Sequence, residues 1–160
     1  MKIVRTQRFL CNPIKQNQNE VTLTGDTAHH LIRVLRLKIG DKVCVFDQSG
    51  REWDAEIVAK KKQSVAVALL NCYQPDVESP VHITLLQSIS KSKRMDIVMQ
   101  KATELGVHRI VPMLSKNTVV RLNAKNIPRK MSHWKKITIS ASEQSGRVRL
   151  PEILEPRELN

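Results

Sequence analysis

The sequence predicts two folded parts, a small β-barrel followed by a parallel α/β domain. Before residue 74, short apolar runs are separated by polar turns, a pattern typical of antiparallel strands. After residues 73–80, a polar linker with two prolines, the pattern changes to strand, helix, strand, helix, strand. Strands that alternate with helices in this way predict a parallel sheet with right-handed connections.

The first part has several predicted strands and one predicted helix. The strands and their turns are residues 42–47, 53–59 and 64–70, with turns at 48–50 and 60–63. The helix covers residues 26–36, with Asp26 or Thr27 as its expected N-cap. Its apolar stripe is Leu31, Val34 and Leu35. Many short strands with one helix favour a small β-barrel.

The second part begins with residues 81–87, which we expect to form a buried strand. An amphipathic helix follows, and Gly106 is the residue type that commonly ends a helix in the left-handed conformation. The stripe of this helix is Met95, Val98, Met99, Ala102 and Leu105. Residues 110–112 then form the second strand. Cations along the helix border predict either a wall for an anionic substrate or an ordinary solvated helix face.

A second helix is expected to begin near Ile127, because Pro128 suits the first helical turn. Apolar residues at helical spacing support it, namely Met131, Trp134, Ile137 and Ala141. Gly146 is its expected end, and residues 152–154 form the last predicted strand.

The composition favours a nucleic-acid partner. The net charge is +12, and residues 91–149 carry 14 basic but only 3 acidic side chains. Concentrated positive charge attracts phosphate and releases counterions on binding. The alternative is a basic protein without such a partner. Aromatic residues make up 3% of the chain, so base stacking is not the main binding device.

The sequence gives no support for a disulfide framework, a metal site, a membrane location or the common nucleotide-binding and nucleophile motifs. The three cysteines, Cys11, Cys44 and Cys72, are far apart, so we expect buried thiols in a reducing cytoplasm, without a disulfide framework or a metal site. The sequence shows no signal-peptide core and no apolar run of membrane-spanning length, which indicates a cytoplasmic protein without a membrane partner. Phosphate-loop, dinucleotide-turn and nucleophile-elbow motifs do not occur.

Three blocks of sequence resemble one family closely. The first is Arg94-Met-Asp96 with Gln100-Lys-Ala-Thr-Glu-Leu-Gly-Val107 and Pro112. The second runs from Trp134-Lys-Lys-Ile137 through Glu143-Gln-Ser-Gly-Arg147 to Pro151-Glu-Ile153. The third is His30-Leu-Ile-Arg-Val-Leu-Arg36 with Gly40-Asp41. These blocks resemble the bacterial ribosomal RNA small subunit methyltransferase E family, which modifies N3 of a uridine in 16S ribosomal RNA and belongs to the knotted SPOUT superfamily.

The resemblance implies an organisation and an activity. Residues 1–74 would be a PUA-like RNA-binding β-barrel, and residues 75–160 the amino-terminal part of a SPOUT methyltransferase domain. The complete family protein uses S-adenosyl-L-methionine, acts on ribosomal RNA or the small ribosomal subunit, and forms a homodimer. The alternative is a catalytically inactive RNA-binding fragment.

One departure from the family concerns the donor site. The family holds the methyl donor in a carboxy-terminal trefoil knot, marked by a Gly-Pro-Glu-Gly-Gly loop, and that loop does not occur in this sequence. We therefore expect no cofactor-binding residue in this chain, which would be a fragment or a truncated gene product. Without the knot, the second domain is expected to be marginally stable, to pair through an open sheet edge, or to depend on a dimer partner.

A first candidate group lies on the early helix. Arg33 and Arg36 are three residues apart and can grip adjacent phosphates, with His30 beside them. In the alternative, His30 packs against the barrel and the arginines are solvated. The family resemblance favours RNA binding by all three residues.

The resemblance places a second candidate group in the substrate pocket. Its candidate catalytic residues are Glu104, Glu143 and Arg147, and its candidate RNA-binding residues are Lys91, Arg94, Lys101, Arg121 and Gln144. Methylation at N3 of uridine requires loss of the imide proton and stabilisation of the negative charge on the base. The alternative for Glu143 and Arg147 is a surface ion pair worth about 0.3–0.5 kcal/mol. The family's Ser-Glu-Arg loop is Ser-Lys-Asn at residues 115–117, which weakens contacts expected from that loop.

Overall fold

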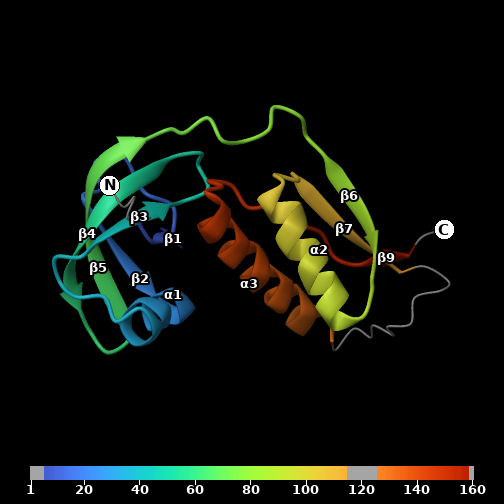
Figure 1. The fold of residues 1–160 in the computed structure, drawn as a ribbon, viewed down its shortest axis with the longest axis horizontal. Coiled ribbons are helices and arrows are strands. Elements are labelled where there is room, and N and C mark those ends of the chain that lie inside the picture. The colour runs from blue at the N-terminus through green and yellow to red at the C-terminus, as the bar shows by residue number, and fades with distance from the viewer. Residues whose placement is uncertain (1–5, 115–125, 159–160) are drawn as a thin grey trace, which may run out of the picture. The chain divides into compact units, whose positions relative to one another are not determined.

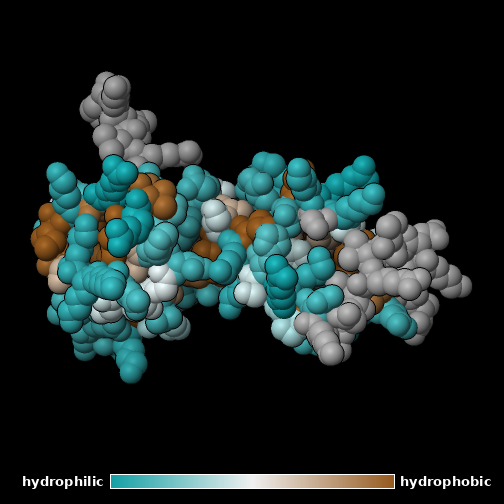
Figure 2. All heavy atoms as spheres, turned by 90° about the horizontal axis from the view of Figure 1, so that it is seen from below, coloured by the Kyte–Doolittle hydropathy of each residue, from teal (hydrophilic) through white to brown (hydrophobic). Residues whose placement is uncertain are grey.

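The computed structural model describes residues 6–114 and 126–158 of the chain. The chain divides into two compact units, Met1–Asp76 and Val77–Asn160. No helix among the described residues is long and apolar enough to cross a membrane. Figure 2 shows hydrophilic residues over most of the visible face of each unit, interrupted by smaller hydrophobic patches.

The first unit is built on one five-stranded sheet. In sheet order its strands are β1 (Arg8–Leu10), β3 (Lys42–Phe46), β4 (Glu52–Lys60), β5 (Ser64–Tyr73) and β2 (Glu20–Thr24). β1 pairs with β3 in parallel, and the other pairs are antiparallel. The register between β4 and β5 shifts twice, and such bulges increase strand twist. The sheet therefore curls into a half-barrel, as the sequence predicts for this part (Figure 1).

The core of the first unit lies on one face of this sheet. Alternate residues of the strands are buried there, as the period-2 pattern predicts; they include Val21, Leu23, Val43, Val45, Trp53, Ile57, Val65 and Val67. Leu31 and Ala28 of the helical segment pack against the same core.

The predicted helix of the first unit is shorter and less regular than the sequence indicates. It consists of α1 (Gly25–His29) followed by a π-helical turn, η1 (His30–Val34), in which the Leu35 N–H donates to the His30 carbonyl. Thr24 holds the N-cap position, so neither Asp26 nor Thr27 does. A π-turn is wider than an α-turn and rotates later residues off the expected stripe. Val34 is accordingly 60% exposed, and the prediction of an apolar stripe through it was wrong.

The second unit is a parallel sheet with two helices packed on it. In chain order its elements are β6 (Thr84–Ser88), α2 (Ser92–Glu104), β7 (Arg109–Leu114), α3 (Ile127–Ser145), β8 (Glu152–Ile153) and β9 (Arg157–Glu158). β7 lies between β6 and β8, and β9 pairs with β7 further along. Figure 1 shows α2 and α3 side by side. This is the predicted strand and helix alternation.

The core of the second unit fills the space between the helices and the sheet. Met95, Met99 and Ala102 of α2 meet Trp134 of α3 and Ile110 of β7. Two predictions at its boundary were wrong. Leu105 is 75% exposed, because α2 ends at Glu104, before the stripe completes another turn. Leu86 in β6 is 62% exposed, because this edge strand is covered on one face only.

Candidate functional site

The two ends of the second unit carry different parts of the predicted substrate pocket. Both helices follow a strand and run back along the sheet, so their first turns lie near the carboxyl ends of β6 and β7 (the carboxyl edge) and their last turns at the opposite amino edge. Lys91 precedes α2 and Glu104 ends it, so about 20 Å of helix separates them at about 1.5 Å per residue. The predicted group is therefore not one cluster.

Arg147 forms a clamp at the amino edge. Its Nε and Nη2 donate to the Glu104 carbonyl at 3.2 and 3.0 Å, and its Nη1 donates to the Val77 carbonyl. The same guanidinium lies 3.6 Å from the Glu78 carboxylate, which accepts hydrogen bonds from the backbone N–H groups of Val148 and Arg149. Arg147, which follows α3, thus joins the end of α2 at Glu104 to the segment at Val77 and Glu78.

The Glu104 carboxylate is engaged by its own helix. Lys101 Nζ lies 2.7 Å from Glu104 Oε2, and Gln100 Nε2 donates to Oε1 at 2.8 Å. The hydrogen bond from Lys101, followed by the one from Gln100, lowers the pKa of Glu104 below the ordinary value. A carboxylate with a lowered pKa is a poorer proton acceptor, which argues against Glu104 as a general base.

The remaining members of the group are dispersed. Glu143 is half-buried and Gln144 is exposed in the last turn of α3, which ends before the left-handed Gly146. Lys91 and Arg94 are exposed at the carboxyl edge. Arg121 and the loop at residues 115–117 lie outside the described residues.

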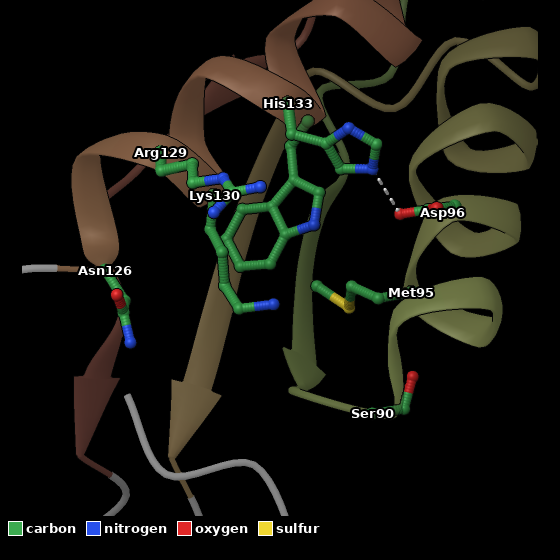
Figure 3. A pocket seen from close by; sticks show the side chains of 8 residues that line it. Ser90, Met95, Asp96, Asn126, Arg129, Lys130 and His133 are labelled. Atoms are coloured by element: carbon green, nitrogen blue, oxygen red, sulfur yellow. Dashed lines mark hydrogen bonds and ion pairs between the residues drawn. The ribbon is translucent and has the colours of Figure 1, made fainter. Parts of the chain in front are cut away.

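The carboxyl edge holds a pocket that the sequence did not predict. This carboxyl-edge pocket has a volume of about 510 Å³. Its lining residues are Ser90, Met95, Asp96, Asn126, Arg129, Lys130, His133 and Trp134. Figure 3 shows these side chains between the first turns of α2 and α3, at the end where the strand arrows stop. Open α/β sheets bind ligands at this edge.

The carboxyl-edge pocket favours an anion. Within the described part of the chain, Arg129 and Lys130 form no ion pair, and Figure 3 shows both side chains among those that line the pocket. Asp96 is the one acidic residue in the lining, and its Oδ1 lies 3.0 Å from His133 Nε2. The Ser90 hydroxyl oxygen is buried and has no hydrogen-bond partner among the described residues. No local pattern signals this site, because its lining comes from two helices that are distant in sequence.

The first unit contains a second basic pocket. Of the three RNA-binding residues predicted in this unit, His30, Arg33 and Arg36, only Arg33 is among its described lining residues. Arg33 lines this pocket, which has a volume of about 470 Å³, together with His29 and Lys62. Arg36 is exposed, and the His30 ring lies 6.3 Å from that of Phe9. Arg33 and Lys62, which lies in the turn between β4 and β5, thus line one pocket, and sequence spacing could not reveal this proximity.

The cysteines do not form a reactive or metal-binding centre within residues 6–114 and 126–158. No group of three or more His, Cys, Asp or Glu residues there is placed to hold a metal ion. Burial raises the pKa of the Cys11 and Cys44 thiols to about 12. Cys72 is exposed, which corrects the expectation that all three thiols are buried.

Comparison with protein families finds matches to both units. A family described as "RNA methyltransferase domain" matches residues 77–160, and one described as "RNA methyltransferase PUA domain" matches residues 23–70. Ribosomal RNA small subunit methyltransferase E of Bacillus subtilis is 29% identical over 93% of this chain and 59% of its own length. The protein of that name from Buchnera aphidicola subsp. Schizaphis graminum is 32% identical over 95% of this chain and 62% of its own length. The chain thus spans less than two thirds of these relatives.

Solved structures agree with the family matches. A putative methyltransferase of Legionella pneumophila, in complex with S-adenosylmethionine, superposes with a TM-score of 0.92 at 35% identity. It covers 97% of this chain, which spans 64% of that one. The ribosomal RNA small subunit methyltransferase E of Neisseria gonorrhoeae, bound to S-adenosylmethionine, gives a TM-score of 0.89 at 34% identity, over 96% of this chain and 63% of its own.

Proposed function

Because this chain belongs to the ribosomal RNA small subunit methyltransferase E family, we propose that it acts in S-adenosylmethionine-dependent methylation of small-subunit ribosomal RNA. The observation that carries this proposal is the match of an RNA methyltransferase domain to residues 77–160, which cover the second unit. The basic pockets of the two units support it, because cations attract RNA phosphates. Bound donor in two similar structures supports the choice of cofactor.

We further propose N3 of a uridine as the methylated atom, as the family resemblance implies. This reaction requires a proton acceptor and a cation near the base. The Glu104 carboxylate accepts hydrogen bonds from Lys101 and Gln100 of its own helix, and Arg147 donates to the Glu104 carbonyl, so the proposal assigns both residues a structural role. It assigns RNA contacts to Lys91 and Arg94 at the carboxyl edge and to Arg33 in the first unit.

The two described pockets of the second unit do not fit the methyl donor. The sulfonium of S-adenosylmethionine is a cation, and the carboxyl-edge pocket already holds Arg129 and Lys130. Its one acidic residue, Asp96, is bonded to His133. A further cavity at the amino edge, lined by His82 and His108, has about 40 Å³, well below the roughly 300 Å³ of small ligand pockets. The described residues therefore suit RNA better than the donor.

This misfit favours a second candidate function, RNA binding by this chain without methyl transfer. The two functions differ in donor binding, which calorimetric titration of S-adenosylmethionine into the 160-residue chain measures directly. Methyl transfer from tritiated donor to small ribosomal subunits then tests the reaction itself. Donor binding with incorporation of label supports the methyltransferase. RNA binding that weakens with salt, without donor binding or label, supports the second function.

Two proposals concern assembly and location. We propose that the active form is a homodimer, because Ile97 on α2 and Leu105 just after it expose apolar surface that a second copy can cover. Sedimentation equilibrium tests this, and a monomer at all concentrations would contradict it. We place the protein in the cytoplasm, where ribosomal RNA is found; fractionation of cells with an antibody against the chain tests this location.

A further inference from the structure

We propose that the carboxyl-edge pocket binds a backbone phosphate of an RNA strand. This inference deepens the proposed function and rests on it for the identity of the ligand. The pocket offers two cations, a hydroxyl without a hydrogen-bond partner among the described residues, and a volume of about 510 Å³ at the edge where α/β sheets bind ligands. These features specify an oxyanion attached to a larger group.

The cations supply the attraction. Arg129 and Lys130 are successive residues in the first turns of α3, and both side chains line the pocket (Figure 3). A guanidinium can donate two parallel hydrogen bonds to a phosphate, and an ammonium adds a mobile positive charge. Since neither forms an ion pair within the described residues, both remain available to a ligand.

The single carboxylate of the lining does not compete strongly. Asp96 would repel a phosphate, but its Oδ1 is held 3.0 Å from the ring of His133. The same contact joins α2 to α3 across the pocket. Asp96 therefore acts as a positioning residue, and the lining keeps an excess of positive charge.

Ser90 supplies an independent sign of a missing ligand. Its hydroxyl oxygen is buried without a hydrogen-bond partner among the described residues, and an unsatisfied buried polar group costs about 1–3 kcal/mol. A phosphate oxygen in the pocket would accept a hydrogen bond from the Ser90 hydroxyl and remove that cost. Met95 and the buried Trp134 ring line the apolar side of the pocket, where a ribose can pack.

The two tryptophans make the test selective. Trp134 lines the pocket and Trp53 lies in the core of the first unit, so the indole N–H spectrum of the ¹⁵N-labelled 160-residue chain contains one reporter and one internal reference. The chain is titrated with inorganic phosphate, uridine, uridine monophosphate, a uridine hexanucleotide and S-adenosylmethionine. We expect phosphate, monophosphate and hexanucleotide to shift Trp134 and not Trp53, with the hexanucleotide effective at the lowest concentration.

A different order of ligand effects on the Trp134 signal would overturn the inference. A shift by uridine equal to that by its monophosphate would indicate a base pocket. A monophosphate that binds as tightly as the hexanucleotide would indicate a free-nucleotide site. A shift by S-adenosylmethionine would indicate the donor site, and the absence of any shift would remove the site altogether.

Matched variants test the assigned residues. Lys130→Gln and Arg129→Gln should each weaken phosphate and hexanucleotide binding by about tenfold or more, as expected for loss of a charge-assisted hydrogen bond. Lys135→Gln removes the same charge from an exposed position on α3 outside the lining, and should leave binding unchanged. An equal loss in Lys135→Gln would contradict the inference. Unchanged indole signals in the free variants establish that the fold is intact.

The proposed function and this inference fail separately. If methyl label is incorporated while Trp134 never responds, the phosphate site is wrong and the function stands. If Trp134 responds to the hexanucleotide but no label reaches ribosomal RNA, the phosphate site stands and the proposed methyltransferase function is wrong.

Discussion

The guanidinium of Arg147 lies directly against Gly106. A Cβ atom at residue 106 would stand 2.9 Å from Arg147 Cζ and 3.0 Å from both Nη atoms. Gly106 also has a φ of 79°, in the left-handed region that favours glycine. The glycine therefore ends α2 and makes room for the side chain that clamps this end, so two requirements converge on one residue.

Replacing Gly106 with alanine should destabilise the second unit. The left-handed backbone costs about 1–2 kcal/mol for a residue with a Cβ, and displacement of the guanidinium adds about 1–3 kcal/mol. Urea unfolding followed at the Trp134 indole signal measures the loss. Gly40→Ala, followed at the Trp53 indole of the first unit, is the control, because residue 40 has a φ of 92° with open space around it and isolates the backbone cost. Equal losses in both variants would argue against the packing contribution.

Arg147→Lys should lower the free energy of unfolding of the second unit by about 1–3 kcal/mol, because lysine cannot donate to the Glu104 and Val77 carbonyls together. Urea titration of the variant and of Arg149→Lys, a charge-matched exposed neighbour, tests this. If stability is unchanged while RNA affinity or methyl transfer falls, Arg147 belongs to the substrate pocket and the structural role is wrong.

The engagement of Glu104 predicts a pH dependence. Hydrogen bonds from Lys101 and Gln100 lower its pKa in the folded state, so its stabilising contribution is present above the unfolded pKa and is lost as the pH falls through the folded value. The stability difference between the native chain and Glu104→Gln should be larger at pH 7 than at pH 3. Urea titrations at both pH values measure it, and high salt should reduce the difference at pH 7. A difference that grows in acid would contradict this account.

The cysteines should react in a fixed order. Burial keeps the Cys11 and Cys44 thiols protonated at neutral pH, with a pKa of about 12, whereas Cys72 is exposed. Because the thiolate is the nucleophile, iodoacetamide at pH 8 should label Cys72 alone in the native chain, and all three thiols in urea. Peptide mass spectrometry identifies the labelled residues. Early labelling of Cys44 would mean that β3 opens readily.

Local patterns predicted most of the elements correctly. The spacing of Met95, Met99 and Ala102 predicted the buried face of α2, and Gly106 and Gly146 marked the ends of the two helices. These features depend on residues within one or two turns of one another. The π-turn at residues 30–34 was missed because its hydrogen bonding depends on packing of Leu31 against the sheet of the first unit.

The site was harder to predict, because it depends on contacts between distant segments. Sequence proximity grouped Arg94 with Glu104, yet one helix carries them toward opposite edges of the sheet. The carboxyl-edge pocket joins Asp96 to His133, which are 37 residues apart. The family resemblance identified the blocks that matter, but only the packing of α2 on α3 separates clamp residues from pocket residues.

The most direct test is the nucleoside composition of small-subunit ribosomal RNA from the source organism, with and without the gene that encodes this chain. We predict that deletion removes N3-methyluridine, detected by mass spectrometry of the digested RNA, and that restoring the gene returns it. An unchanged set of methylated nucleosides after deletion would contradict the proposed function.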